Sequence, residues 1–319
     1  MNLRGKKRGV LWAGTMLLLV AAVLVALLPA AREPVYQGRK LGVWLDAVSG
    51  GNPQIAPTSA LTSVQAVGAD ALPWLLAELE ARDWQPGEHP FREALGLRPL
   101  QARQRESRAR TGLVLLGDAA LPVIPELVSR LSNSNRSVSA RFALDAIAAG
   151  PRSHLVNGVL GGLTNVVPPA SSNAHAAVLE AFLGAVRGTS EWASAESLYA
   201  LGMYSENAAQ ILPVILPRTR DKSIWVRRGA LWALGRLARE PVPVIPELIR
   251  ALDDSDVEAR RMAAWALGQY YRQAKTAVPR LLEARRDPDP EVRKAANESL
   301  DKIDPETAAA IPDLPGFKP

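Results

Sequence analysis

The chain has 319 residues, a net charge of +6 and no cysteine, which excludes disulfides and thiolate chemistry. Four of the six positive charges lie in residues 1–9, so the remainder carries about +2, too little to indicate nucleic-acid binding from bulk charge. Four Phe and five Tyr, with bulk from Ala, Leu, Val and eight Trp, suit thin helix pairs better than one globular core.

Residues 10–28 are uncharged and, at about 1.5 Å per residue, span the roughly 30 Å hydrocarbon core of a bilayer. A cleavable signal peptide is the alternative, but its apolar region normally runs about 7–15 residues, and residues 28–31 match a cleavage site poorly. We expect an uncleaved transmembrane signal anchor at 10–28 after a basic cytoplasmic segment at 1–9. The positive-inside rule then predicts a single-pass protein of the bacterial cytoplasmic membrane, with its C-terminal domain on the outer, periplasmic side.

Residues 29–53 follow as a polar tether with one short helix at its end. Residues 54–205 read as degenerate helical repeats with insertions. Gly68 and Gly117 each begin a Gly-Asp/Ala-rich hexad that ends in proline, where we expect Gly to end one helix and Asp to cap the next. The helices expected in this region are 54–67, 74–79, 100–116, 124–131, 138–148, 155–163, 174–186 and 193–204, and 84–99 is expected to be a loop insertion.

Residues 206–304 contain three copies of a regular repeat with a period of 33 residues. The period is carried by Pro213, Pro246 and Pro279, by Asp221, Asp254 and Asp287, and by Arg227, Arg260 and Arg293. In each copy a first helix has one apolar stripe, and a turn with an N-cap residue (Ser223, Asp256 or Asp289) leads into an Ala- and Leu-rich second helix. Small Ala residues at the contacts predict tightly stacked helix pairs, and 305–319 is expected to be an irregular Pro-rich tail.

The repeat resembles a known family. Pro in the first helix, the turn Asp-x-Ser/Asp-x-x-Val-Arg, and Ala-Leu-Gly in the second helix (residues 230–235 and 263–268) resemble HEAT repeats of the short type named after phycobilisome lyases. The front end also resembles membrane-anchored or exported bacterial HEAT-repeat domain proteins. The resemblance implies an all-α, right-handed α-solenoid of antiparallel helix pairs after one N-terminal transmembrane helix. Tetratricopeptide repeats have a similar period, but proline inside the first helix argues against them.

The recurrent Asp and Arg residues predict a structural ladder along the stack, formed by Asp221, Arg227, Asp254, Arg260, Asp287 and Arg293. The alternative is a row of anion-binding arginines; the ladder is favoured because each Arg accompanies an Asp.

Two residue pairs indicate a partner-binding surface. Arg228 with Trp232, and Arg261 with Trp265, are four residues apart at equivalent positions, so we expect each Arg beside its Trp on the second-helix surface. The alternative is that both Trp rings fill the groove between repeats.

No catalytic pattern is present in the sequence. The three histidines, His89, His154 and His175, lack ligand-spaced neighbours, and no phosphate loop, nucleotide fingerprint or nucleophile motif occurs, so we expect no metal, cofactor or catalytic site. The activity of the lyases is not transferred, because there is no cysteine or identifiable chromophore pocket. The arginines at 98, 103, 105, 108 and 110 are interpreted as a solvated face rather than a nucleic-acid site, because they spread around the helix.

The sequence therefore predicts a membrane-anchored, monomeric scaffold that binds an unknown protein partner and has no catalysis of its own. Two alternatives remain: a lyase-type HEAT-like enzyme or enzyme subunit, which would have a deep pocket of titratable groups near His154 or His175, and a nucleic-acid-binding solenoid with a continuous positive groove.

Overall fold

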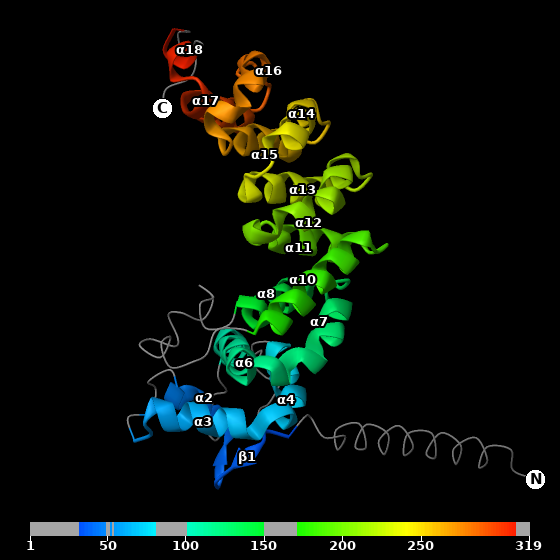
Figure 1. Ribbon diagram of the computed structural model, residues 1–319. Helices are drawn as coiled ribbons and strands as arrows, with labels where there is room; N and C mark the ends of the chain where they lie inside the picture. The colour runs from blue at the N-terminus through cyan, green and yellow to red at the C-terminus, as the bar shows by residue number, and fades with distance from the viewer. Residues whose placement is uncertain (1–31, 49–51, 53, 81–100, 150–170, 311–319) are drawn as a thin grey trace, which may run out of the picture. The chain divides into compact units, whose positions relative to one another are not determined.

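The computed structural model describes residues 32–48, 52, 54–80, 101–149 and 171–310 (Figure 1). These residues belong to two compact units, of which unit 1 ends at Leu116 and unit 2 begins at Gly117. The expected transmembrane segment at 10–28, the loop insertion at 84–99 and the helix at 155–163 lie outside the described residues.

Unit 1 consists, in its described part, of four α-helices and one hairpin. Its elements are β1 (Val35–Tyr36), β2 (Arg39–Lys40), α2 (Leu41–Val48), α3 (Pro57–Val67), the 3-10 helix η1 (Gly68–Ala71), α4 (Leu72–Leu79) and α6 (Ala102–Leu116). Helix α2 packs on α3, and α4 packs on α6, through buried Leu, Val, Ala and Trp side chains. The helices expected at 54–67, 74–79 and 100–116 are thus present, with shifted ends.

The described part of the segment expected to be a tether forms a hairpin and a helix. Strands β1 and β2 pair antiparallel, with Val35 opposite Lys40. The Glu33 carboxylate accepts a hydrogen bond from the Gly42 amide at 2.8 Å, and the Trp44 indole donates to the Tyr36 carbonyl at 3.2 Å. These contacts link the hairpin to the buried start of α2, which the polar composition of the segment did not indicate.

Unit 2 contains five helix pairs in its described part, stacked in chain order (Figure 1). The first members, here called A helices, are α7 (Ile124–Arg130), α10 (Ser172–Arg187), α12 (Ala208–Ile215), α14 (Pro241–Ala251) and α16 (Val278–Ala284). The second members, the B helices, are α8 (Ser137–Ala149), α11 (Glu191–Leu201), α13 (Ile224–Leu237), α15 (Val257–Gly268) and α17 (Pro290–Ile303). Short 3-10 helices connect or extend them: η2 (Gly117–Val123), η5 (Ser205–Asn207), η6 (Leu216–Arg220) and η7 (Tyr271–Ala277).

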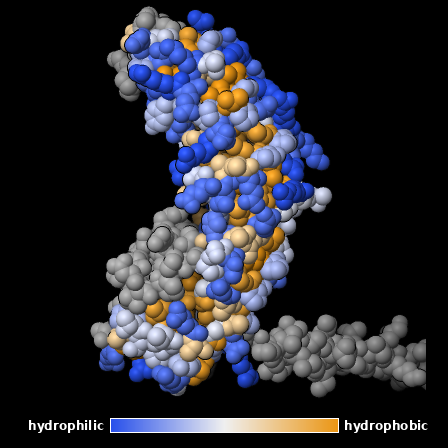
Figure 2. Space-filling model, viewed as in Figure 1, coloured by the Kyte–Doolittle hydropathy of each residue, from blue (hydrophilic) through white to orange (hydrophobic). Residues whose placement is uncertain are grey.

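Each B helix packs on the next B helix, so that a continuous core runs along the unit. The second-helix positions expected to be buried are buried in all three regular repeats: for example, Ala230, Ala263 and Ala296 are each 0% exposed. In the A helices the expected stripe is buried at Leu212, Ile245 and Leu281. Hydrophobic patches lie among hydrophilic residues on the visible surface of unit 2 (Figure 2), as expected of amphipathic helices that are not fully covered.

The helix starts follow the cap chemistry of the turns. Ser223, Asp256 and Asp289 are the N-caps of α13, α15 and α17, and their side chains accept hydrogen bonds from backbone amides of the first turn. The hexads differ in part from expectation. Gly68 and Gly117 do adopt positive φ, but the helix continues as a 3-10 turn, so Asp70 and Asp118 cap nothing; Asp118 instead accepts a hydrogen bond from the Ser171 hydroxyl.

The start of the segment expected to be an irregular tail is helical. Helix α18 (Pro305–Ala310) packs on α17. Proline suits its first position, and the Asp304 carboxylate accepts hydrogen bonds from the amide and the hydroxyl of Thr307. This local capping overrides the low apolar content of the segment; residues 311–319 lie outside the described part.

One helical run among the described residues, Ala102–Arg130, is long and apolar enough to cross a membrane by length and composition. Its most apolar window is 56% buried inside the structure, and core helices of soluble proteins pass the same test.

Candidate functional site

The B helices of unit 2 carry a group of aromatic side chains on one face. The residues are Trp192 and Tyr199 on α11, Trp225 and Trp232 on α13, and Trp265 on α15, and we call them the aromatic face. The Trp232 and Trp265 rings stack with centroids 5.0 Å apart and planes 13° apart, and Tyr199 lies 6.2 Å from Trp232. Trp192 stacks on Trp225 at 5.6 Å. The repeat thus places one aromatic ring above the next along the stack.

The rings differ in their exposure. Trp232 and Trp265 are half-buried, and the Trp265 ring lies against Gly235 of the neighbouring helix. These two rings therefore fill part of the groove between repeats, as the alternative interpretation expected. Trp192 and Trp225 remain 38% and 40% exposed. They are the part of the aromatic face that is most available to a partner.

The predicted Arg–Trp pairs do not form in the described residues. The Arg228 guanidinium lies over Trp225, 4.9 Å from the ring centroid, and forms a two-pronged ion pair with Asp256 at 2.6 and 2.7 Å. Arg261 binds Glu258 on its own helix, with 2.7 Å between Nε and Oε2. Arg236, not Arg228, lies over Trp232, at 6.0 Å.

The physical reason is the direction of side chains on a helix. Cα–Cβ bonds tilt toward the N-terminus, so a long side chain covers residues three or four positions earlier. Arg228 therefore reaches back to Trp225, and the residue positioned to reach Trp232 is Arg236. The hydrogen bond to Arg228 lowers the pKa of Asp256 and raises the pKa of Arg228, so the pair stays ionised at neutral pH.

The six ladder residues connect consecutive turns of the stack. Arg227 donates to the Asp254 carboxylate of the next repeat at 2.8 Å, and Arg260 donates in the same way to Asp287 at 2.8 and 3.0 Å. Each arginine also donates to the carbonyl of its own repeat's aspartate: Arg227 to Asp221, Arg260 to Asp254 and Arg293 to Asp287. Each Asp carboxylate accepts the amide of the N-cap residue two positions later. The ladder thereby satisfies loop backbone, and its arginines are occupied.

A second group of charged residues lies between α8 and α11. Arg141 pairs with Glu196 at 3.0 Å, and the Tyr204 hydroxyl hydrogen-bonds Asp145. Burial raises the pKa of Asp145 to about 7; Arg141 lowers the pKa less strongly, and the Glu196 charge raises it further. Oδ1 of Asp145 is buried and has no hydrogen-bond partner in the structure. An unpaired buried acceptor is unusual in a native protein.

His175 adjoins this group but is held by other contacts. Its Nε2 lies 3.1 Å from Oδ1 of Asn207, and its ring lies 5.1 Å from the Tyr204 ring. His89 and His154 lie outside the described residues. No cluster of three metal-ligand side chains occurs in the described part of the chain.

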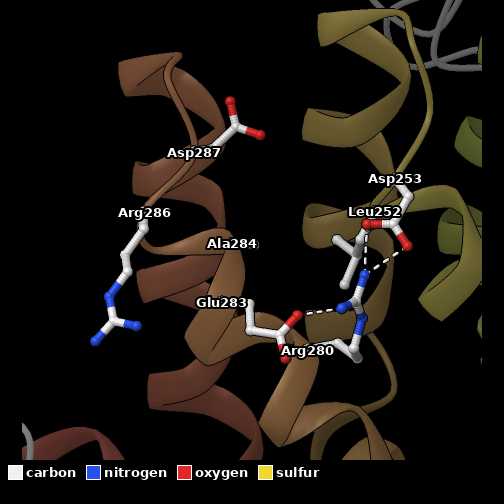
Figure 3. Close-up of a pocket in the computed structure, with 7 residues that line it drawn as sticks. All are labelled: Leu252, Asp253, Arg280, Glu283, Ala284, Arg286 and Asp287. Atoms are coloured by element: carbon white, nitrogen blue, oxygen red, sulfur yellow. Dashed lines mark hydrogen bonds and ion pairs between the residues drawn. The ribbon is translucent and has the colours of Figure 1, made fainter.

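A surface pocket of about 140 Å³ opens between the end of α14 and α16 (Figure 3). This volume is below the roughly 300–1,000 Å³ of ligand pockets. Arg280 is held between Asp253 and Glu283, Asp287 belongs to the ladder, and Arg286 points away from the pocket. Four of its five charged side chains are thus already bound, Asp287 by Arg260 of the ladder, so the pocket is a weak candidate for a ligand site.

The arginine row of unit 1 is used in ion pairs inside that unit. Arg105 binds Glu78, Arg108 binds Asp46, and Arg110 binds Glu106. Arg103 is exposed, and Arg98 lies outside the described residues. The pairing explains why three of these arginines are only partly exposed, which the solvated-face interpretation had not foreseen. Among the described arginines of the row, it leaves no converging set for phosphates.

Sequence reasoning missed Trp192, Tyr199 and Trp225. The same 33-residue period that relates Trp232 to Trp265 also relates Tyr199 to Trp232, and Trp192 to Trp225. Extending the period one repeat toward the N-terminus finds Trp192 and Tyr199, and Trp225 already lies within the regular repeats. The signal is weak because residues 155–204 show no regular Asp-Arg turn.

Stacked antiparallel helix pairs that contact only their neighbours define the class of protein as an α-solenoid. Residues 245–314 match the family model described as HEAT repeats, and residues 211–240 match that of a HEAT repeat. The two matches fall on the last three helix pairs of unit 2. No curated protein matches the chain by sequence.

Three similar solved structures are a structural genomics consortium's engineered protein, a designed armadillo repeat protein in complex with the peptide (KR)4, and human deoxyhypusine hydroxylase in complex with glycerol. Their identities are 16%, 18% and 18%, and their TM-scores 0.45, 0.41 and 0.34. The alignments cover 84%, 73% and 83% of this chain, and 99%, 99% and 98% of the others.

Proposed function

We propose that this chain is a membrane-anchored HEAT-repeat scaffold that binds another protein through the aromatic face and has no catalysis of its own. The observation that carries the proposal is the half-exposed stack of Trp192 and Trp225 on consecutive B helices. Stacked repeats present extended surfaces for partners, and large aromatic side chains supply much of the binding energy at protein interfaces.

The anchor and its orientation are supported by the sequence alone. Residues 10–28 have the length and composition of a membrane span, and basic residues precede them. The proposal places the repeats on the outer side of a bacterial cytoplasmic membrane. The Pro, Asp and Arg positions of the repeat support the short HEAT-like type, without its lyase chemistry.

The test is photocrosslinking in the native membrane. A photoreactive amino acid at position 192 should capture a protein, and the same group at position 242 on α14, where Val242 is 84% exposed, is the matched control. The captured protein should disappear when Trp225 is replaced by Ala. Capture of the same protein from both positions, unaffected by Trp225→Ala, would contradict the proposal.

A lyase-type enzyme or enzyme subunit is the second candidate, and the Asp145 group is the observation that favours it. Asp145, Tyr204 and His175 converge as such a site would require. It ranks second because His175 and Arg141 are occupied by Asn207 and Glu196. The test is an Asp145→Asn variant expressed in cells that lack the natural chain. If it still crosslinks to the partner through position 192 but no longer restores normal growth, the enzyme becomes the favoured function.

A further inference from the structure

The contact between α8 and α11 differs from the other contacts between B helices. The consecutive helices α11, α13, α15 and α17 pack on one another through larger contacts than the one between α8 and α11. Gly229 of α13 shows how close these contacts are, since a Cβ atom there would come 3.0 Å from the Ala195 carbonyl oxygen of α11. The 33-residue period places Glu196 at the same position of α11. A long charged side chain therefore lies between α8 and α11, where glycine lies between α11 and α13.

The side chains in this contact are polar. Glu196 pairs with Arg141 of α8 at 3.0 Å and accepts a hydrogen bond from the Ser137 hydroxyl at 3.4 Å. Asp145 and Ser197 each have a buried oxygen without a hydrogen-bond partner in the described structure. The later B helices have alanine in place of Ser197. Buried polar atoms without partners cost free energy, so this contact is weaker than the alanine-lined contacts that follow it.

The charge of this contact depends on Asp145. Arg141 and Glu196 balance each other, so an ionised Asp145 adds one negative charge that no cation offsets. Burial raises the pKa of Tyr199 and of Tyr204, whose hydroxyl hydrogen-bonds Asp145, so both phenols stay neutral. Burial also raises the pKa of Asp145 to about 7, so this carboxyl is neutral below that pH and charged above it.

The charged groups of the other helices around α8 have partners elsewhere or lie at the surface. Helices α7 and α10 also pack on α8, and His175 of α10 lies 3.1 Å from Asn207. The remaining described groups are Glu126 paired with Arg130 on α7, Glu180 bound to Gln210 and exposed Arg187 on α10, Glu191 bound to Ser223 on α11, and exposed Arg136 before α8. Among the described residues, the charges that act on Asp145 are those of Arg141 and Glu196. Protonation of Asp145 therefore decides whether this contact is neutral or holds a negative charge.

We propose that the contact between α8 and α11 is a pH-sensitive joint: ionisation of Asp145 loosens it, and the α7–α8 pair opens away from the repeats that follow, which stay folded. A buried charge without a partner is costly, and opening lets water reach the carboxylate. The ninth residue of α11, α13 and α15, which matches Asp145 in α8, is Tyr199, Trp232 or Trp265, so the response is confined to this joint. This inference goes beyond partner binding, because it makes the arrangement of helix pairs in unit 2 depend on pH.

Hydrogen–deuterium exchange followed by mass spectrometry tests the joint on the full chain in detergent micelles. Peptides from residues 137–149 should exchange about tenfold faster or more at pH 8 than at pH 5, after correction for the intrinsic pH dependence of amide exchange. The reason is that the open state has an ordinary carboxyl pKa, so protonation favours the closed state and loss of the proton favours the open state. Peptides from α13, α15 and α17 should change by less than about threefold.

The variants assign the response to one group. Asp145→Asn supplies a neutral side chain of nearly the same shape, so residues 137–149 should exchange slowly at both pH values. Histidine is the other side chain that ordinarily changes charge between about pH 5 and 8. The matched control is therefore the chain with His89, His154 and His175 replaced by Gln, which should keep the tenfold response of the natural chain.

Three results would overturn the proposal. The first is corrected exchange of residues 137–149 that is equal at pH 5 and pH 8. The second is a response that persists in Asp145→Asn, which would assign it to another group. The third is parallel acceleration in α8, α13, α15 and α17, which would show that the whole unit loses stability and that no joint opens.

Discussion

Among single residues, Asp254 is a buried carboxylate at the centre of the ladder. Its side chain is 5% exposed, accepts two hydrogen bonds from Arg227 of the preceding repeat, and accepts a third from the Asp256 amide of its own repeat. Because the carboxylate is surrounded by donors, its pKa is lowered: burial opposes the shift, and the hydrogen bonds from Arg227 and the Asp256 amide outweigh it. The residue acts as a structural link and is unavailable to a ligand.

We therefore expect Asp254→Ala to lower the free energy of unfolding by about 2 kcal/mol, since it leaves Arg227 and a backbone amide without their acceptor. The exposed Arg220, which pairs with Glu247 on the surface, is the matched control. Arg220→Ala should leave the unfolding midpoint nearly unchanged. Urea unfolding followed by circular dichroism measures both; equal effects would show that burial of the ladder is not what matters.

Asp145 predicts a pH dependence of stability. Its pKa is about 7 in the folded chain and near 3.8 in the unfolded chain, so the folded state binds the proton more tightly. Stability should fall as pH rises from about 4 to about 7 and then level off, because burying the ionised carboxylate is costly. Asp145→Asn should remove this slope and raise stability at pH 8 by about 2–4 kcal/mol, up to the free energy that the full pKa shift represents.

The measurement is the urea unfolding midpoint of the natural chain and of the Asp145→Asn variant at pH 5 and pH 8. A parallel pH profile for the variant and the natural chain would show that Asp145 is ionised without penalty.

At the scale of helices, close approach of neighbouring B helices determines where the aromatic rings lie. Gly235 on α13 faces α15, where a methyl group would come 2.9 Å from Cβ of Ala266 and nearer still to the Trp265 ring. Glycine there leaves room for the Trp265 ring, which stacks on Trp232. The stacking of the aromatic face thus depends on a residue that bears no side chain.

Gly235→Ala should destabilise the chain by about 1–3 kcal/mol through overpacking, although alanine is the better helix former. Gly184 in α10 has open space at the equivalent atom, so Gly184→Ala should be neutral or stabilise by about 0.5 kcal/mol. Thermal unfolding midpoints measure the stability of both variants. The Gly235 variant should also lose near-ultraviolet dichroism from the Trp232–Trp265 stack, and an unchanged spectrum would show that the rings tolerate the displacement.

For the whole molecule, the proposed anchor makes a prediction about partitioning. The full chain should sediment with membranes and be released by detergent but not by alkaline carbonate, and removal of residues 1–31 should release the repeats into the soluble fraction. Reporter fusions at residue 40 and at the C-terminus should be active on the outer side only. Cytoplasmic activity of both fusions would refute the orientation.

Much of the fold could be predicted because the repeat is encoded locally. The apolar stripes, the N-caps Ser223, Asp256 and Asp289, and the period of the ladder are all readable from neighbouring residues, and they recur in the structure. The hairpin β1–β2 and helix α18 were missed, because contacts with α2 and a cap at Asp304 order segments whose composition alone suggests irregular chain. The sequence predicted Trp232 and Trp265 as part of the candidate site, but it did not predict their exposed neighbours Trp192 and Trp225.

The sequence by itself determined the helix pairs, their period and the residues that cap and stack them, because these depend on interactions within about four residues or on exact repetition. Only the tertiary structure decided what the arginines of the B helices contact, which tryptophans remain exposed, and why Oδ1 of Asp145 lacks a hydrogen-bond partner. Those outcomes depend on side-chain direction and on burial by helices far away in the chain: Glu196, for example, pairs with Arg141, which lies 55 positions earlier in the sequence. Local sequence patterns do not predict such contacts, because they form only when one repeat packs on the next.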